Sequence, residues 1–222
     1  MCQDKIYTLH FVLERKGDRM WKRCRTPSAA ARYGAALRLE AERMQQMEGG
    51  LFPRYFGFTD DPLPAVCMEY LPGGCMQPLS TFDHREMERQ VAQVLERVLH
   101  MTEVLEQAGL LYWDIRLNNL IGRAGADFRM IDFTGAQMLG TAQTFTRGPA
   151  FRDASGQALW DGLGCNELRR VLALRTLACE LLGLSRGEEA PTPALRRLLA
   201  QGARPAYGLC ARTWLDAFCQ NL

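Results

Sequence analysis

The feature that most constrains this sequence is the change in periodicity at Pro72-Gly73-Gly74. Before this break, short segments alternate apolar and polar residues, as half-buried strands do; after it, apolar residues recur every three or four positions, as on a helix face. Proline and glycine interrupt regular elements. We therefore predict a single α+β domain with two lobes: a small strand-rich lobe (about 1–72), a hinge (about 69–74) and a mainly helical lobe (about 75–222).

The first lobe is predicted to contain two strand pairs with one helix between them. The predicted strands are residues 6–13, 19–25, 54–58 and 65–70. Turn-forming residues at 15–18 join the first two strands into a hairpin. Thr26 and Pro27 are typical of a helix start, and the helix is expected to run to Met47.

The second lobe is predicted to be mainly helical. Its helices are expected at about 84–108, 166–183, 192–201 and 207–220. The first carries an apolar stripe of Met87, Val91, Val94, Val98, Met101 and Leu105, which favours burial. Short strands are expected at 110–113, 120–121 and 128–133, and a long loop over 136–165. The pair Arg169-Arg170 is expected on a solvated helix face.

Length, charge and cysteine spacing exclude several classes of protein. A chain of 222 residues fits one domain, and a net charge of +2 gives no reason to expect nucleic acid or a membrane surface as partner. No apolar run is long enough to span a membrane, and the N-terminus lacks a signal-peptide core. The eight cysteines show no C-x-x-C spacing, so we expect free buried thiols and a cytoplasmic protein, with export to a host cell left open.

The candidate chemistry begins in an unusually polar loop between apolar segments. Asp114, Arg116 and Asn119 follow an apolar run, and Asp132 comes 18 residues after Asp114. Burying such groups is costly unless they are used. Phosphoryl transfer uses this set: one carboxylate orients a hydroxyl, a cation meets the phosphoryl group, and an amide oxygen and a second carboxylate hold magnesium.

On these residues the sequence resembles the protein-kinase-like fold, over about residues 6–183. The segment 112–119 (Tyr-Trp-Asp-Ile-Arg-Leu-Asn-Asn) is similar to the kinase catalytic loop H-R-D-L-x-x-x-x-N, and Ile131-Asp132-Phe133 is similar to the start of D-F-G. The resemblance implies Asp114 and Arg116 as catalytic residues, and Asn119 and Asp132 as ligands of Mg²⁺.

The resemblance also implies an ATP site. The stretch 68–74 (Met-Glu-Tyr-Leu-Pro-Gly-Gly) is similar to the kinase hinge, with Met68 as gatekeeper and the backbone of Glu69 and Leu71 contacting adenine. Lys22, on the second strand of the predicted hairpin, would hold the nucleotide phosphates. Glu40 is its expected partner because it shares a helix face with the methionines that follow it, whereas Glu42 lies about 160° away.

Several positions depart from the kinase pattern. No Gly-x-Gly-x-x-Gly loop precedes the predicted hairpin, so we expect weaker or different binding of ATP. Trp113 and Thr134 replace the family's arginine and glycine, which argues against a switch by loop phosphorylation or D-F-G flipping, and Met20 narrows the adenine site. The segment 148–153 is only a degenerate counterpart of the Ala-Pro-Glu motif. The helices that dock peptide substrates in the family are mostly missing.

Several residues near the candidate site are expected to have a structural role and not a chemical one. Tyr112, Met44 and Phe133 are expected to be packing residues; in the family their equivalents form a hydrophobic spine between the lobes. His84 and His100, on the long helix, are expected to be structural.

The function that the resemblance implies is an ATP-dependent kinase acting on an alcohol group, in first place a minimal serine/threonine protein kinase similar to small bacterial effector-type kinases. Its partner would be a protein substrate. A small-molecule or lipid-sugar kinase with a hydroxyl acceptor is the second possibility, because the peptide-docking surface is reduced. A pseudokinase acting as a binding module is the third.

Overall fold

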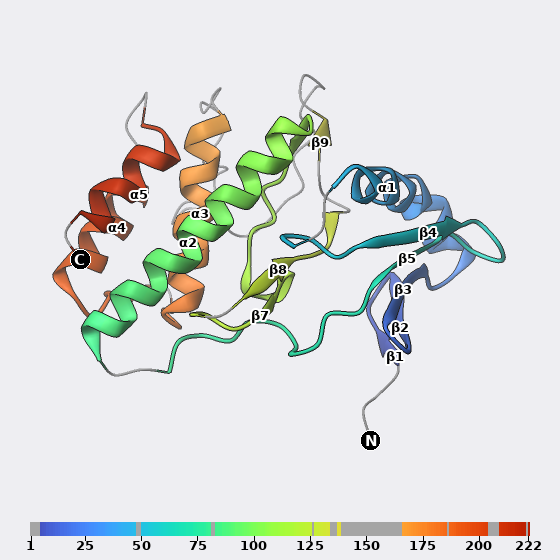
Figure 1. The fold of residues 1–222 in the computed structure, drawn as a ribbon, viewed down its shortest axis with the longest axis horizontal. Helices are drawn as coiled ribbons and strands as arrows, with labels where there is room; N and C mark the ends of the chain where they lie inside the picture. Colours follow the sequence, from blue (N-terminus) through green and yellow to red (C-terminus); the bar gives the residue numbers. More distant parts are fainter. Residues whose placement is uncertain are drawn as a thin grey trace.

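A five-stranded antiparallel sheet and a group of packed helices make up the fold (Figure 1). The computed structural model describes residues 5–47, 50–80, 83–125, 127–133, 137–138, 166–185, 187–203, 209–220 and 222. In Figure 1 the sheet and helix α1 lie on one side, and helices α2 to α5 lie together on the other. The predicted mixture of helix and sheet in an α+β fold is therefore confirmed.

The large sheet has the strand order β1-β2-β3-β5-β4, with every neighbouring pair antiparallel. Its strands are β1 (Lys5–Tyr7), β2 (Phe11–Lys16), β3 (Arg19–Cys24), β4 (Tyr55–Thr59) and β5 (Ala65–Glu69). Side chains alternate between the two faces of a strand, so Met20, Lys22 and Cys24 share one face of β3. Lys22 and Cys24 on this face are almost fully buried.

Helix α1 (Pro27–Gln46) covers that buried face of the sheet through contacts with β3, β4 and β5. It starts where the sequence predicts: the Thr26 side chain accepts a hydrogen bond from the Ala29 N–H, and Pro27 occupies the first turn. Its buried stripe contains Leu37, Glu40 and Met44. The helix thus turns one carboxylate toward the sheet among apolar neighbours.

The helical part is built around α2. Its helices are α2 (His84–Gln107), α3 (Asn166–Leu181), α4 (Pro193–Ala203) and α5 (Ala211–Cys219). Five of the six residues in the predicted stripe of α2 are buried, with Val91, Val94 and Val98 fully inaccessible, whereas Met87 is half-buried; α2 packs against α3 and α5. None of the helices in the described ranges combines the length and apolarity needed to cross a bilayer.

Two small antiparallel ladders lie between the sheet and the helices. Their strands are β6 (Leu110–Leu111) with β9 (Gln137–Met138), and β7 (Leu120–Gly122) with β8 (Phe128–Met130), and the 3-10 turn Leu117–Asn119 precedes β7. Gly109 ends α2 with a φ of 78°, a conformation that glycine adopts without strain. These ladders hold the polar loop 112–119 beside the segment 131–133.

The predicted single strand over residues 6–13 is wrong. The chain turns back at Thr8–Phe11, where the Thr8 N–H donates to the Phe11 carbonyl at 2.9 Å and the Thr8 hydroxyl accepts from the Phe11 N–H at 2.9 Å. Residues 5–16 therefore form a hairpin of their own, β1–β2. The strand that carries Lys22 becomes the third strand of the sheet.

Two further expectations need correction. Arg169 and Arg170 are not solvated: they are 6% and 4% exposed, and Arg170 forms ion pairs with Glu106 and Glu167. Of the predicted loop 136–165, residues 137–138 form β9, and the remainder, with the degenerate motif at 148–153, lies outside the described residues, as does Thr134.

The cysteines agree only in part with the expectation. The six described cysteines are free thiols, but only Cys24 and Cys67 are buried, whereas the other four are half-buried.

The turn between β7 and β8 depends on Gly122. A Cβ atom there would lie 2.6 Å from the Asp127 carbonyl oxygen and 2.8 Å from the Phe128 Cα, at a φ of 135°. We expect Gly122→Ala to lower the free energy of unfolding by about 3 kcal/mol, because rigid backbone must move. Gly125→Ala, also at positive φ but in open space, should cost only about 1 kcal/mol. Urea denaturation measures both, and equal losses would contradict the clash.

Candidate functional site

A pocket of 510 Å³ lies where the large sheet meets the segments 118–121 and 131–132. Its walls are mostly apolar, from Ile6, Phe11, Leu13, Met20, Met68, Leu71, Ile121 and Ile131. Its polar lining is concentrated in Thr8, Lys22, Glu40, Glu69, Asn118, Asn119 and Asp132. The structure thus brings seven of the nine predicted site residues to one pocket; Asp114 and Arg116 do not line it.

Lys22 joins two carboxylates at the inner end of this pocket. Its Nζ lies 2.8 Å from Glu40 Oε2 on α1 and 2.5 Å from Asp132 Oδ1. Lys22 is 5% exposed and Glu40 is 1% exposed, whereas the Asp132 side chain is 42% exposed. Three distant parts of the chain therefore meet in one cluster of charges, which is buried at Lys22 and Glu40 and accessible to solvent at Asp132.

The electrostatics of Lys22 are set by two opposing effects. Burial, the largest effect, lowers the pKa of the ammonium group, but the carboxylates of Glu40 and Asp132 together more than compensate and raise it above its ordinary value. Lys22 is therefore a permanent cation at physiological pH. A compact cation fixed between two acids can meet a further anion without having to be ordered first.

The second oxygen of Glu40 fixes the segment after Asp132. Glu40 Oε1 accepts a hydrogen bond from the Phe133 N–H at 3.1 Å. The Phe133 ring is buried and packs against Phe52 and Tyr112, each with ring centroids 5.5 Å away. Phe133 and Met44 are buried packing residues, as predicted.

Asp132 itself has a φ of 65°, an uncommon conformation for a residue with a side chain. Such strained positions persist only where surrounding contacts hold them, as Lys22 does here, and they cluster at functional sites.

Asn119 is the centre of the second polar group. Its Nδ2 donates to Tyr112 Oη at 2.9 Å, to the Asp114 carbonyl at 2.8 Å and to Asp114 Oδ2 at 3.2 Å. Arg116 forms an ion pair with Asp114. The Ile131 N–H donates to the Asn119 carbonyl at 2.9 Å, which ties this loop to Asp132. The predicted pair Asp114 and Asn119 is thus in direct contact.

Tyr112 does more than the packing that the sequence predicts. Its hydroxyl accepts from Asn119 and donates to the Ile131 carbonyl at 3.3 Å. Burial, helped by the nearby Asp114 and Asp132 carboxylates, raises its pKa well above the ordinary value, so the phenol stays protonated. The signal that could have revealed this role is a phenol immediately before the polar loop, where a buried hydroxyl needs a partner.

Glu180 is a second residue that the sequence analysis missed. Its Oε2 on α3 accepts the Leu117 N–H at 2.8 Å, at the start of the 3-10 turn that carries Asn119. No side chain within that turn caps its first N–H groups, so a carboxylate from a distant helix satisfies one of them. Nothing local in the sequence connects residues 63 positions apart.

The predicted hinge residues lie along one wall of the pocket. Met68 is buried and pairs with Met20 of β3, so two methionines meet at the site that the sequence predicts to be narrow. Glu69 accepts the Arg54 N–H at 3.1 Å and an Arg129 guanidinium N–H at 2.6 Å through the same carboxylate oxygen. Its side chain is therefore committed to fixing the wall rather than projecting into the pocket.

The oxygen donors near Lys22 fit a hard cation only in combination with a ligand. The three hydrogen bonds of the Asn119 amide within the described part of the chain are all donated by its nitrogen, so its oxygen could bind a metal, and the partly exposed carboxylate of Asp132 lines the same pocket. The described residues contain no cluster of three or more acidic, histidine or cysteine side chains that would hold a metal alone. One carboxylate and one amide suit Mg²⁺ when phosphates and water complete the coordination shell.

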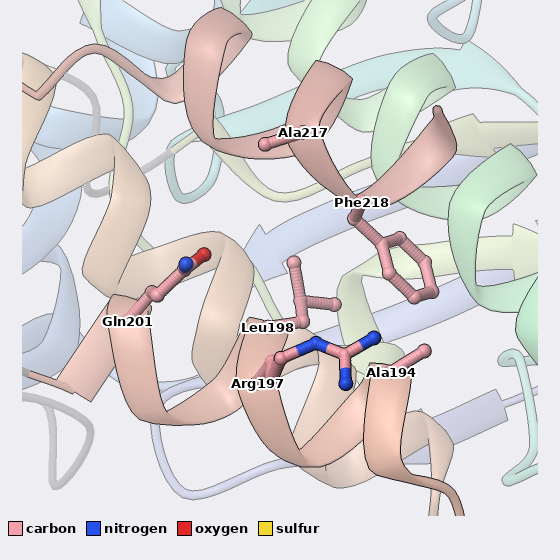
Figure 2. Close-up of a pocket in the computed structure, with 6 residues that line it drawn as sticks. All are labelled: Ala194, Arg197, Leu198, Gln201, Ala217 and Phe218. Carbon is pink, nitrogen blue, oxygen red and sulfur yellow. The ribbon is translucent and has the colours of Figure 1, made fainter. Parts of the chain in front are cut away.

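Figure 2 shows a different pocket, between α4 and α5. Its volume is 240 Å³, and its lining is Ala194, Arg197, Leu198, Gln201, Ala217 and Phe218. Arg197 is its one charged lining residue, and none of the six could accept a proton at neutral pH. The pocket between α4 and α5 therefore offers no acid or base for catalysis, unlike the pocket at Lys22.

The chain matches no model of a known protein family and no curated protein sequence.

The buried pair of Lys22 and Glu40 gives a direct test of the site geometry. We expect Glu40→Gln to lower the free energy of unfolding by about 3 kcal/mol, because a buried ammonium loses its principal counter-charge. The matched change Glu42→Gln, on the exposed face of the same helix, should alter it by less than about 0.5 kcal/mol. Chemical denaturation measures both, and equal effects would mean that Glu40 does not face Lys22.

Proposed function

We propose that the protein is an ATP-dependent phosphotransferase of the protein-kinase-like type, acting on an alcohol group. The observation that carries the proposal is the meeting of Lys22, Glu40 and Asp132 at a pocket that Asn119 also lines. Magnesium-dependent phosphoryl transfer requires a fixed cation, a metal-binding carboxylate and an amide oxygen close together.

The strand order strengthens this proposal. In protein kinases the nucleotide lysine is on the third strand and pairs with a glutamate of the following helix. Lys22 lies on β3 and Glu40 on α1, the helix directly after it. The sheet with α1 and the group α2 to α5 would then be the two lobes, with the 69–74 segment as the hinge between them.

The pocket walls fit the two ends of a nucleotide. Apolar side chains from β2, β3 and β5 suit a base, with the backbone of Glu69 and Leu71 as its hydrogen-bonding partners and Met68 behind it. Lys22 lies at the polar end, where the α- and β-phosphates would be held. The β1–β2 turn brings Thr8 to the pocket in place of a glycine-rich loop, so phosphates would meet a hydroxyl-bearing turn there.

The loop around Asp114 supplies the acceptor side of the reaction. Asp114 would orient the attacking hydroxyl, and Arg116, now paired with Asp114, would neutralise the moving phosphoryl group. Asn119 and Asp132 would hold Mg²⁺ against the nucleotide phosphates. A serine or threonine side chain of a protein is the proposed acceptor; a hydroxyl of a small molecule or lipid-linked sugar is tested alongside.

The assignment of roles predicts different losses at the two aspartates. Asp114→Asn should reduce phosphate transfer at least about 100-fold but leave the thermal stabilisation by ATP and Mg²⁺ intact, because Asp114 does not line the pocket. Asp132→Asn should abolish both transfer and the magnesium-dependent part of the stabilisation. Transfer of radiolabelled phosphate to the protein itself, to a generic protein substrate and to small alcohols, together with thermal shift, measures these effects.

The matched control is Asp127→Asn, a change at an exposed carboxylate of the same region whose side chain is 96% accessible. It should leave both readouts unchanged. Stabilisation by ATP without any transfer in the unaltered protein would favour the pseudokinase instead. Absence of both, in a folded protein, would overturn the nucleotide site.

A further inference from the structure

The sheet face turned away from α1 is rich in cations and aromatic rings. Because Lys22 points toward α1, its neighbours Trp21 and Arg23 belong to the opposite face of β3. Residues directly across an antiparallel ladder share a face. The register thus adds five residues to Arg19, Trp21 and Arg23: Lys5, Tyr7, Val12, Glu14 and Lys16. We call this surface the outer face.

The outer face carries more positive charge than its acids balance. Two further cations come from the flanks of the sheet. Arg25 lies over the Tyr7 ring, and Arg54 lies over the Phe56 ring, which Arg19 also contacts. Its cations are Lys5, Lys16, Arg19, Arg23, Arg25 and Arg54, against the carboxylates of Glu14, Asp18 and Glu69. This excess of three exceeds the net charge of +2 of the whole chain, so the imbalance is local.

A pocket of 270 Å³ opens on this face, on the opposite side of the sheet from Lys22. Its walls are Lys5, Tyr7, Val12, Glu14, Trp21, Arg23, Cys24, Arg25, Pro62 and Leu63. Two aromatic rings, three apolar residues and one thiol therefore surround three cations and one carboxylate. The hollow has room for a single charged group and the carbon atoms next to it.

Two guanidinium groups in this pocket lack an acidic partner. Among the described residues, neither Arg23 nor Arg25 forms an ion pair, and the buried Nε of Arg23 has no hydrogen-bond acceptor. The carboxylate of Glu14 is already held by Lys5 at 3.1 Å and Lys16 at 3.6 Å. A buried donor without an acceptor is unfavourable, so an anion that accepts a hydrogen bond from Arg23 would remove this cost.

We propose that this pocket binds a phosphate monoester carried on an extended segment of a partner protein. A phosphate monoester carries a charge of about −1.5 to −2 at pH 7, which balances the two unpaired guanidinium groups, whereas one carboxylate would balance only half of it. Arginine also offers the planar pair of donors that matches phosphate oxygens. The rings of Tyr7 and Trp21 would contact the apolar part of the phosphorylated residue.

A protein segment fits this place better than a lipid surface. The pocket is recessed between the sheet and Pro62-Leu63, whereas a bilayer would need charges that project. Strand β1 ends the sheet, so its outer edge has no strand neighbour in the described part of the chain, and an extended segment could pair with it. The proposal does not depend on phosphotransfer at Lys22.

The test follows the indole N–H signal of Trp21, which lies within the pocket, in the NMR spectrum of the full chain. The signal is assigned from Trp21→Phe, and the probe is an acetylated, amidated Ala-phosphoserine-Ala peptide. We expect a saturable shift that the unphosphorylated and the glutamate-containing peptides do not reproduce. Arg23→Gln and Arg25→Gln should each weaken binding at least about 10-fold, because each removes one charge from the pair.

The matched control is Arg32→Gln, an exposed arginine on α1 outside the pocket, which should bind the peptide normally. Circular dichroism verifies that both pocket variants are folded. If both pocket variants bound the peptide as tightly as the unaltered protein, or if the glutamate peptide gave the same shifts as the phosphoserine peptide, the proposal would be overturned. Inorganic phosphate binding as tightly as the peptide would reduce the site to one for a free anion, and a response only to phosphatidylserine vesicles would assign it to membranes; each contradicts a protein ligand.

Discussion

The rest of the structure depends on the compensation of one buried cation. Lys22 lies in the interior, and a charge there is tolerated only when opposite charges and hydrogen bonds surround it. Glu40 and Asp132 meet this demand from α1 and from the segment after β8. Because Glu40 also binds the Phe133 N–H, the same carboxylate sets the position of the sheet, the helix and the strained residue Asp132. A shift of any of these elements would leave a charge unpaired, so the pocket geometry and the fold are maintained by the same interaction.

The elements that the sequence predicts well are those whose signal is local. The stripe on α2 and the start of α1 at Thr26-Pro27 follow from helical periodicity and capping, which act within a few residues. For the partner of Lys22, the resemblance implied a glutamate of the helix, and helical spacing selected Glu40, which is buried, over Glu42, which is exposed. The nearness of Asp132 was an expectation from the resemblance alone, since no local pattern relates residues 110 positions apart.

Two of the predictions that failed are the single strand over residues 6–13, which is broken by a turn that contains no glycine, and the exposure of Arg170, which has a partner on a helix distant in the sequence. Polar and apolar residues alternate through Thr8 and His10 without interruption, so the strand over 6–13 looked continuous, yet Thr8 supplies its own turn through its hydroxyl. After this turn the faces change: Tyr7 lies on the outer face, while Phe11 and Leu13 line the pocket. Arg170 looked like a surface residue because one of its two acidic partners, Glu106, is on another helix, and the other, Glu167, would also suit an exposed helix face.

Strand β3 carries cations on both of its faces, but within the described part of the chain only the cation on the inner face is neutralised by ion pairs with acids. Lys22 and Arg23 are neighbours in sequence, but alternation sends one toward α1 and the other to the outer face. On the inner side, burial forces the fold to supply acids, and two are present. On the outer side, half-buried Arg23 and exposed Arg25 can be hydrated in part, so folding does not require their neutralisation. The positive excess there is not needed for stability, which is why it remains available to the charge of another molecule.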